Sequence, residues 1–481
     1  MEDKIKAVTD IWGDVFGKEN TNPDDNFFDL GGDSIMALKM MELLRRKGYT
    51  ISLMDVFDDP TLEGIIEAVV SIEKDSSANT LTEEQQNTYP ASNQQKWFFK
   101  NIRTGRDEWC EYVILSPKNE KFPAPERAAE FLFENRLFRN YSMVFKNNEL
   151  YFEVSDKMPP VICTDNFSVD ECRRIMSENI RIKDGITSCM VYDKSGNIAL
   201  IIHHLFSDAV SIQNIISVLD EYETESDYTD MLYATYAWKK HDEENSTPFD
   251  IKLYDEDNNA EYLSAERTVI SDTAIYDKIT EISHEWGVTP ECLLLSVLKE
   301  ASENILMSPV IEIERIGRDI SGEWNRICGW ISYSRNISFS DINGCEIREN
   351  ARIIHEILSK PSKDDEDTVL NKPVSSLSWN YIGNMDSSID FNNCMISGFG
   401  QFSGEKSGRF SPAYCAVYFR DGKLVCSINY DSLKYSGEDT EKLQKNILTA
   451  LENLISGFEM KKNEELSSIY EILGGISIED N

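Results

Sequence analysis

The sequence is poor in basic residues and in histidine, and it has no long apolar segment. Its 481 residues include only five His, and none of its ten Cys lies in a CxxC pair, so neither a zinc site nor another metal centre is expected. Cysteines spread this widely are typical of buried or free thiols in a reducing compartment. No apolar run approaches the roughly 18 to 20 residues of a membrane span. The acidic start MEDKIKAVTD is unlike a secretory signal, so we expect a cytoplasmic protein.

Acidic residues far outnumber basic ones, which gives the chain a large negative charge. Lys and Arg total 48 and Asp and Glu total 85, which gives a formal net charge of −37. A field of that sign repels phosphate backbones and anionic lipid, so nucleic acid and membrane surfaces are poor candidates for partners. A protein with a basic patch of its own is a better candidate. The length predicts about three folding units.

Residues 1–75 have the pattern of a small all-helical domain. Apolar residues recur at helical spacing between Ile5 and Phe16, and a second amphipathic stretch covers Ser34–Lys47. A third helix is expected after Thr61, which suits an N-cap. Residues 76–88 are polar and lack aromatic residues, so we interpret them as a linker.

Beyond residue 88 the pattern changes to strands that alternate with helices. An apolar strand is expected in IALIIHHLF, and AYCAVYFR and KLVCSINYD are expected to form a hairpin through Asp421–Gly422. A polar stretch at Lys239–Ala260 divides this region near its middle. A last helix is expected at Gly437–Ile455. Other helices are expected at Ala124–Asn135, Val169–Asn179, Val210–Tyr222, Thr273–Trp286 and Thr289–Leu306, followed by a strand at Pro309–Glu314.

The segment FFDLGGDSIMALKM places a serine at the start of a helix. Gly31 and Gly32 allow a tight turn, after which Ser34 meets the unpaired N–H groups of the helix N-terminus. That position favours a phosphate group. An alternative interpretation is that Asp33 or Ser34 is only an N-cap.

This segment closely resembles the phosphopantetheine attachment site of carrier proteins, a hydrophobic pair followed by D-x-G-G-x-S. The resemblance implies a 4′-phosphopantetheine arm on Ser34, added by a phosphopantetheinyl transferase and holding an aminoacyl or peptidyl thioester. Asp33 is typical of carriers that precede epimerization domains in nonribosomal peptide synthetases. Acidic residues nearby suit docking to a basic face of a transferase or partner domain; they are Asp24, Asp25, Asp29 and Asp33.

The segment IIHHLFSDAVS holds two adjacent histidines, His203 and His204. Neighbouring residues of a strand point to opposite faces, so only one of the two can face a given cavity. Two hydrogen-bonded core histidines are the alternative. The segment resembles the HHxxxDG motif of the condensation superfamily, which includes chloramphenicol acetyltransferase. The resemblance implies that His204 faces the active-site channel, and that His203 and Asp208 are structural, with Asp208 paired to an Arg.

Other motifs of the epimerization branch follow in the expected order. IEIERIGRDI resembles E-G-H-G-R-E and keeps Glu314, Gly317 and Arg318. ICGWIS resembles V-G-W-F-T, SWNYIGNMD resembles F-N-Y-L-G-Q-F-D, and ASNQQKWFF resembles the opening P-I-Q-x-W-F-F. Ser211 matches the form HHxxxDxxSW that the epimerization branch carries. The chain departs from the usual motifs at five positions, which are Ala209, Ile212, Arg315, Ile316 and Asp319.

The resemblance implies a set of site residues. His204 and Glu314 would exchange protons with the α-carbon of the substrate from opposite faces, although the sequence leaves open which of them is the base. Asn380 and Tyr381 would donate hydrogen bonds or position the arm. The remaining group would hold the site together; it consists of His203, Asp208, Ser211 and Arg318. The alternative to a catalytic role for Glu314 is a structural ion pair with Arg315 or Arg318.

The implied architecture is a small four-helix-type carrier domain followed by a two-lobed α/β domain like chloramphenicol acetyltransferase. The N-lobe would cover residues 89–249, the C-lobe 250–458, and a tail at 459–481 would be either a docking helix or a frayed terminus. The implied reaction is L-to-D inversion of the carrier-bound residue. The alternatives are a condensation or acyltransfer enzyme and a catalytically silent domain that recognises carriers. Implied partners are an adenylation domain, in cis or in trans, and the condensation domain of the next synthetase module.

Overall fold

The computed structural model describes most of the chain. The described residues are 2–17, 21–27, 30, 32, 34–51, 55–56, 59–71, 81–102, 104–147, 149–222, 228, 232–243, 263–315, 317–318, 326–360, 375–384, 391–402 and 411–474. Most of the expected loop at Lys239–Ala260 lies outside them, as do Asp33, Ile316 and Asp319. Within the described ranges, no helix combines the length and the apolar character that crossing a membrane requires.

The N-terminal domain is helical, as expected. Its core is built from side chains on all three main helices, and Trp12, Met40 and Ile65 are each 0% exposed. Thr61 caps the third helix because its side chain accepts a hydrogen bond from the Gly64 N–H at 3.0 Å. The elements are α1 (Glu2–Phe16), α2 (Ser34–Arg46), α4 (Leu62–Ala68) and a two-stranded sheet of β1 (Tyr49–Thr50) and β2 (Val70–Ser71).

The expected linker contains a short helix. Residues Glu83–Asn87 form α5, which begins with a capping box between Thr82 and Gln85. The indole of Trp238 donates to the carbonyl of Gln85 at 3.0 Å and to that of Thr88 at 3.2 Å. Leu81 packs against the large core that follows. Polar composition alone does not reveal such contacts, because they come from a helix far along the chain.

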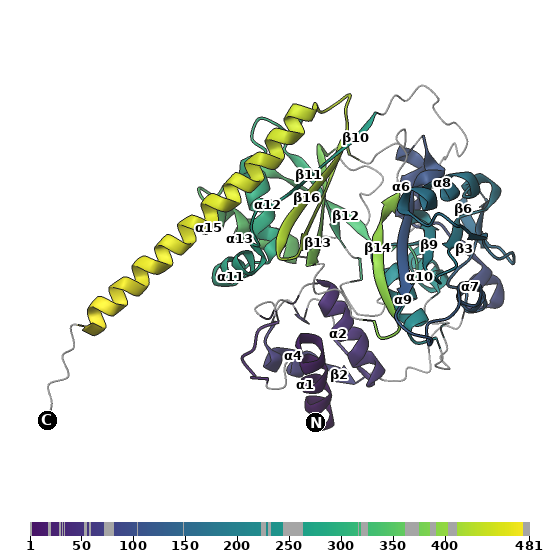
Figure 1. Cartoon of the computed structure of the whole chain (residues 1–481), viewed down its shortest axis with the longest axis horizontal. Helices are drawn as coiled ribbons and strands as arrows, with labels where there is room; N and C mark the ends of the chain where they lie inside the picture. The colour runs from purple at the N-terminus through teal and green to yellow at the C-terminus, as the bar shows by residue number, and fades with distance from the viewer. Residues whose placement is uncertain are drawn as a thin grey trace.

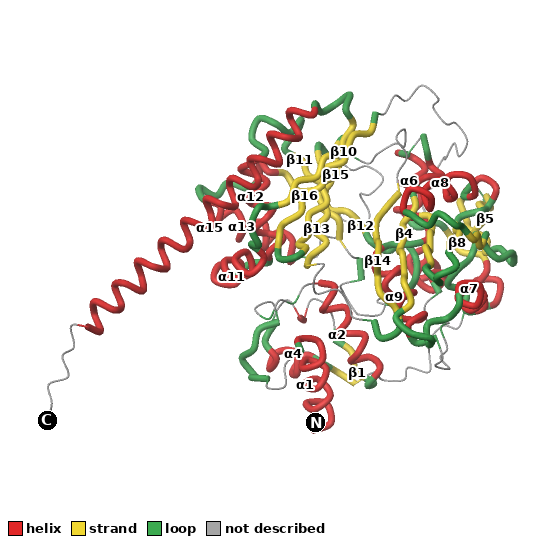
Figure 2. The backbone as a smooth tube through the Cα atoms, in the orientation of Figure 1, coloured by secondary structure: helices red, strands yellow, loops and turns green. Residues whose placement is uncertain are grey.

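The N-lobe contains a five-stranded and a three-stranded sheet with helices around them (Figure 2). The five-stranded sheet has the order β14 (Cys394–Phe402), β4 (Cys110–Pro117), β9 (Ile198–His203), β8 (Ser188–Tyr192), β7 (Val161–Cys163). The other has the order β3 (Thr88–Pro90), β6 (Glu149–Val154), β5 (Tyr141–Lys146). The helices are α6 (Asn93–Asn101), α7 (Pro125–Glu134), α8 (Val169–Asn179), α9 (Ala209–Asp220) and α10 (Tyr233–Glu243).

The C-lobe is a six-stranded mixed sheet with helices packed on one face (Figure 1). The turn of its hairpin is at Asp421 and Gly422, which have φ of 51° and 67°, so this prediction is confirmed. The strand order is β10 (Ser264–Ile270), β16 (Lys423–Asp431), β15 (Ala413–Arg420), β13 (Leu377–Asn384), β11 (Val310–Arg315), β12 (Tyr333–Ser338). The helices are α11 (Tyr276–Trp286), α12 (Pro290–Ala301), α13 (Ile347–Ser359) and α15 (Gly437–Gly474).

The two lobes are not continuous in the sequence. Strand β14 follows β13 of the C-lobe along the chain, but it pairs antiparallel with β4 of the N-lobe sheet. The expectation that residues 250–458 form one lobe is therefore incorrect for β14. A strand pattern shows that a segment pairs, whereas the partner strand depends on contacts distant in sequence.

The last helix continues past the expected end at Ile455 and reaches Gly474. Its contacts with the C-lobe core end near Phe458, and Lys462 still pairs with Glu281. Beyond that point α15 projects away from the two lobes, as Figure 1 shows. The proposed boundary at residue 458 therefore falls inside one helix.

The helical domain lies beside both lobes. Val210, in the first turn of α9, packs against the core of the helical domain. Met36 of α2 lines a cavity of about 570 Å³ whose other wall includes Tyr276 and His284 of α11. In Figure 1 the start of α2 points toward the boundary between the lobes. Ser34 is the first residue of α2, so it lies at the end of the helix that points toward this boundary.

Candidate active site at the lobe boundary

His203 is a structural residue at the end of β9. Its side chain is 0% exposed, its Nδ1 accepts from the Leu205 N–H at 3.1 Å, and its Nε2 lies 2.7 Å from the Arg106 carbonyl. Because a carbonyl only accepts, Nε2 carries the proton and the ring is neutral. Burial lowers the pKa of His203 to about 3. This histidine therefore does not take up a proton near neutral pH.

His204 lies in a tight turn and not on the strand. Strand β9 ends at His203, and His204–Phe206 form a short 3₁₀ helix in which the His204 N–H donates to the Trp109 carbonyl at 2.8 Å. Nδ1 of His204 lies 2.7 Å from the Ser207 carbonyl, so Nδ1 donates to that carbonyl and Nε2 is the ring nitrogen that could exchange a proton with a substrate. The ring stacks on Trp330 at 4.7 Å. These contacts orient the imidazole, as a proton-transfer group requires.

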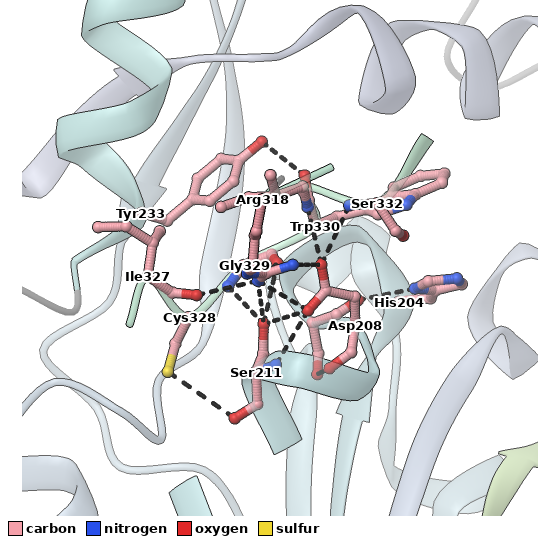
Figure 3. Close-up of polar contacts among 12 residues, drawn as sticks. His204, Asp208, Ser211, Tyr233, Arg318, Ile327, Cys328, Gly329, Trp330 and Ser332 are labelled. Carbon is pink, nitrogen blue, oxygen red and sulfur yellow. Dashed lines mark hydrogen bonds and ion pairs between the residues drawn. The ribbon is translucent and has the colours of Figure 1, made fainter. Parts of the chain in front are cut away.

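Asp208 connects the two lobes through its carboxylate (Figure 3). Arg318 donates to its two oxygens at 2.5 Å and 2.8 Å, so Arg318 is the arginine that the resemblance implies without naming it. Ser211 donates its N–H at 2.9 Å and its hydroxyl at 2.7 Å, while the N–H groups of Ile331 and Ser332 donate at 3.0 Å and 3.1 Å. Burial by itself raises the pKa of Asp208, but Arg318 and these hydrogen bonds hold it below its ordinary value.

Replacement of Asp208 by Ala is expected to destabilise the protein by about 3–5 kcal/mol, because Arg318 is left buried and unpaired. The lowered pKa means that ionised Asp208 stabilises the fold above pH 3.8 and that this contribution is lost as the pH falls below that value. The difference between variant and wild type should therefore shrink in acid. Denaturant unfolding at several pH values measures it. Asp165→Ala, which removes an exposed ion pair with Lys194, should change stability by less than about 1 kcal/mol; equal losses in both variants would contradict the prediction.

The segment that holds Trp330 requires a glycine next to it. A Cβ on Gly329 would lie 1.9 Å from the ring of Tyr233, so a larger residue does not fit there. The Tyr233 hydroxyl donates to the Trp330 carbonyl at 3.1 Å. On the other side of the turn, the buried amide of Gln95 donates to the Leu205 carbonyl at 2.6 Å. The motifs ICGWIS and ASNQQKWFF, which supply Trp330 and Gln95, thus both support the turn that carries His204.

Glu314 lies on β11 of the C-lobe. Ile311 and Ile313 of this strand enter the C-lobe core, so Glu312 and Glu314 lie on the opposite face of the sheet. Burial raises the pKa of Glu314 to about 7 against the opposing charge of His204, and Glu312 adds to the increase. The sequence offers Arg315 and Arg318 as alternative ion-pair partners of Glu314. In the structure Arg315 pairs with Glu291 at 2.9 Å, and Arg318 pairs with Asp208. Glu314 is therefore a carboxyl that changes its charge near neutral pH.

Asn380 joins Glu314, but Tyr381 does not. Asn380 hydrogen-bonds to Glu314 and donates to the Tyr414 hydroxyl at 2.8 Å. Tyr381 packs against the C-lobe core, on the other face of β13. Neighbouring strand residues alternate between faces, so Tyr381 lies on a different face from Asn380, and its expected part in the site stays a prediction. Tyr414 on β15 joins the cluster, and sequence reasoning missed it.

Glu111 on β4 is a second residue that sequence reasoning missed. It interacts electrostatically with His204 and with Glu314, so it belongs to the same cluster of ionisable side chains and comes from the N-lobe. A charged residue inside the expected strand EYVILS is the one sequence signal that could have marked it. The structure thus brings together His204, Glu314, Asn380, Tyr414 and Glu111.

The attachment segment fits a phosphate ester on its serine. Ser34 is the first residue of α2, so the positive end of the helix dipole lies next to it. The preceding turn is closed by a hydrogen bond from the Gly32 N–H to the Phe27 carbonyl at 2.8 Å. A Cβ on Gly32 would lie 2.3 Å from the Phe27 ring, so this turn requires glycine.

Comparison with known proteins first identifies the helical domain. Residues 6–69 match the family model described as "Phosphopantetheine attachment site". The chain is 41% identical over 92 residues to surfactin synthase subunit 1 of Bacillus subtilis, an alignment that covers 19% of this chain and 3% of that protein. The helical domain is therefore a carrier domain of the kind that bears covalent 4′-phosphopantetheine.

Longer alignments cover the two-lobed domain as well. The chain is 23% identical over 518 residues to surfactin synthase subunit 2 of Bacillus subtilis, covering 93% of this chain and 14% of that protein. It is 23% identical over 545 residues to bacitracin synthase 2 of Bacillus licheniformis, covering 100% of this chain and 20% of that protein. The chain thus spans at most about a fifth of the length of these relatives.

Solved structures establish the fold of the two lobes. The epimerization domain from the third module of tyrocidine synthetase B superposes with a TM-score of 0.54 at 18% identity, covering 77% of this chain and 98% of that one. The condensation domain of the Monacolin K polyketide synthase superposes with a TM-score of 0.57 at 12% identity, covering 77% and 97%. The chain combines a carrier domain with a two-lobed α/β domain whose fold is shared by these epimerization and condensation domains.

Proposed function

We propose that this carrier domain and its condensation-type domain invert the α-carbon of a carrier-bound residue from L to D in nonribosomal peptide synthesis. The observation that supports this most is the pair formed by His204 on the N-lobe and Glu314 on the C-lobe, which interact electrostatically across the lobe boundary. Inversion requires proton removal from one face of a carbon and proton delivery to the other. Two ionisable groups on opposing lobes suit that requirement.

The position of the carrier supports the proposal. Ser34, as the proposed attachment residue, begins the helix that points toward the lobe boundary, and Val210, two residues after Asp208, packs on the carrier core. When bound, the arm presents its cargo as a thioester, whose carbonyl makes the neighbouring C–H more acidic. Around this cargo, Asn380 and Tyr414 supply hydrogen-bonding groups, and the Asp208–Arg318 pair keeps the lobes in register.

A condensation or acyltransfer reaction is the second candidate. The two-lobed fold superposes on a condensation domain with a TM-score of 0.57 and on an epimerization domain with a TM-score of 0.54. The fold therefore favours the two reactions equally. In that reaction His204 would assist the attack of an amine or hydroxyl on the thioester. Glu314 has no required part in it, whereas the proposed inversion needs a second proton-carrying group. The presence of Glu314, Asn380 and Tyr414 in one cluster therefore supports inversion.

The partners follow from the carrier. We propose that a phosphopantetheinyl transferase acts on Ser34, that an adenylation domain loads the arm, and that the condensation domain of a following module receives the product. The formal charge of −37 suits partners that present a basic face.

Exchange of the α-proton separates the two candidates. The chain is converted with a phosphopantetheinyl transferase, loaded with an L-aminoacyl group and transferred into D₂O. We expect deuterium at the α-carbon and D-aminoacyl thioester, both detected after cleavage by mass spectrometry and chiral chromatography. Ser34→Ala should accept no cofactor and show neither signal. Transfer to an added amine acceptor without deuterium incorporation would show that the domain condenses, and loaded protein with neither reaction would indicate a domain that only recognises carriers.

A further inference from the structure

Three adjacent strands of the C-lobe sheet carry polar side chains on the face turned toward the lobe boundary. Strands β11, β13 and β15 pair parallel, and every second residue of each strand enters the core beneath the C-lobe helices. The residues between them point to the other face of the sheet, which Figure 1 shows turned toward the N-lobe. On that face lie Glu314, Asn380 and Tyr414, one from each strand.

The register of the strands brings these three side chains together. Ile313 is paired with Trp379, so the residues that follow them, Glu314 and Asn380, lie side by side on neighbouring strands. Tyr414 is paired with the residue two positions before Asn380, on the same face, so it lies diagonal to Asn380. The amide of Asn380 spans this diagonal and donates to the Tyr414 hydroxyl at 2.8 Å. Asn380 therefore stands between the carboxyl of Glu314 and a tyrosine hydroxyl.

The hydroxyl of Tyr414 keeps a proton that it can donate. It is the acceptor in its bond with Asn380, so its own O–H remains for another partner. Among the residues that the structure describes, none accepts a hydrogen bond from this hydroxyl. Burial raises the pKa of Tyr414 well above its ordinary value, so the proton is retained at neutral pH. Tyr414 is nevertheless only half-buried, so a ligand between the lobes can approach it.

The proposed inversion needs a hydrogen-bond donor in addition to its two proton carriers. Removal of the α-proton places negative charge on the thioester oxygen, and a preorganised donor at that oxygen lowers the barrier. His204 uses its Nδ1 proton to hold the Ser207 carbonyl, and its Nε2 and the carboxyl of Glu314 are the proposed proton carriers. The hydroxyl of Tyr414 remains as a neutral donor in the same cluster.

We propose that Tyr414 is a catalytic residue whose hydroxyl donates a hydrogen bond to the carbonyl oxygen of the carrier-bound thioester. When the α C–H bond breaks, its electron pair moves toward that oxygen and an enolate-like C–O bond forms. The hydrogen bond from Tyr414 strengthens with this charge, while its O–H bond stays intact. When a proton forms the new C–H bond, the electron pair returns and the carbonyl is restored.

Infrared spectroscopy of a loaded thioester tests this hydrogen bond without turnover. The inference rests on the proposed function for its effect on inversion, whereas the hydrogen bond requires only that the arm deliver a thioester. The chain is converted with a phosphopantetheinyl transferase and loaded with α-aminoisobutyrate, which carries ¹³C at its carbonyl and has no α-proton. A hydrogen bond polarises and weakens the C=O bond, so its stretch should lie at higher frequency in Tyr414→Phe than in the wild type. Equal frequencies in the two loaded proteins would overturn the proposal.

Tyr418→Phe is the matched control on the same strand. Tyr418 lies four residues farther along β15, on the same face, and is likewise half-buried, but it is paired with Gly383 beyond Asn380. Its loss should leave the carbonyl stretch at the wild-type frequency. A shift of equal size in Tyr418→Phe and Tyr414→Phe would show a general effect of altering this face and would contradict the role of Tyr414.

Exchange of the α-proton gives the catalytic readout. With an L-aminoacyl group on the arm, Tyr414→Phe should slow deuterium incorporation by ~10²–10³-fold, the loss that follows removal of one oxyanion donor. Tyr418→Phe should stay within about two-fold of the wild type. Unchanged exchange in Tyr414→Phe would remove this hydroxyl from the catalytic group. An infrared shift in Tyr414→Phe, in a protein whose wild type shows no exchange, would retain the hydrogen bond and refute the proposed inversion alone.

Discussion

Replacement of His204 by Ala is expected to slow formation of the D-aminoacyl thioester by ~10²–10⁴-fold, the range that general acid–base groups contribute. The ring is held by the Ser207 carbonyl at Nδ1 and by stacking on Trp330, which leaves Nε2 as the proton acceptor. Because His204 is only half-buried, the variant should fold and accept the cofactor. Chiral analysis of the cleaved product after timed incubation measures the rate.

His241→Ala is the matched control for this prediction. His241 is also a half-buried N-lobe histidine, but it contacts Glu149 and the ring of Trp238. Its removal should leave the rate of D-product formation within about two-fold of the wild type, as expected for a residue outside the proton path. Unchanged D-product formation by His204→Ala, in protein that carries cofactor and substrate, would remove His204 from the mechanism.

Glu314→Gln is expected to reduce D-product formation by ~10²–10⁴-fold, because glutamine neither gives nor takes the proton. In the wild type the pKa of about 7 means that Glu314 is mostly protonated below pH 7 and ionised above it. We propose that the protonated carboxyl of Glu314 delivers the proton, so wild-type exchange should decline as the pH rises through about 7. The residual rate of the variant should lack this decline. Initial rates of deuterium incorporation between pH 5.5 and pH 9 are the measurement.

Glu266→Gln serves as the control for charge. Glu266 is an exposed carboxylate on β10, at the edge of the same C-lobe sheet. This variant should keep both the rate and its decline near pH 7. If Glu314→Gln retained the decline, another group would be responsible for it, and the assignment of Glu314 as the acid would be incorrect.

Local chemistry determined much of the fold in advance. Helix α8 has the expected bounds Val169–Asn179 because its apolar residues repeat at helical spacing after the capping Ser168. The hairpin at Asp421–Gly422 follows from two residues that tolerate positive φ. The attachment segment could likewise be identified from its residues alone, since Gly32 and the start of α2 are adjacent in sequence.

The catalytic group was only partly predictable. The motifs identify His204 and Glu314, and the resemblance implies an ion pair between Asp208 and an arginine, whereas only the structure shows that this arginine is Arg318. Tyr381 belongs to a motif of the epimerization branch and Tyr414 to none, yet Tyr381 packs against the C-lobe core. Glu111 could not be selected, because one charged residue in an expected strand does not show what lies across the sheet.

The amino-acid sequence by itself determined which segments form helices, strands and the attachment turn, because these depend on periodicity, capping and backbone freedom within a few residues. Only the tertiary structure decided that β14 joins the N-lobe sheet and that Glu111, His204, Glu314 and Tyr414 meet. Sheet order and the face that a strand presents depend on partners hundreds of residues away, and the ionisation of each carboxyl depends in turn on that burial.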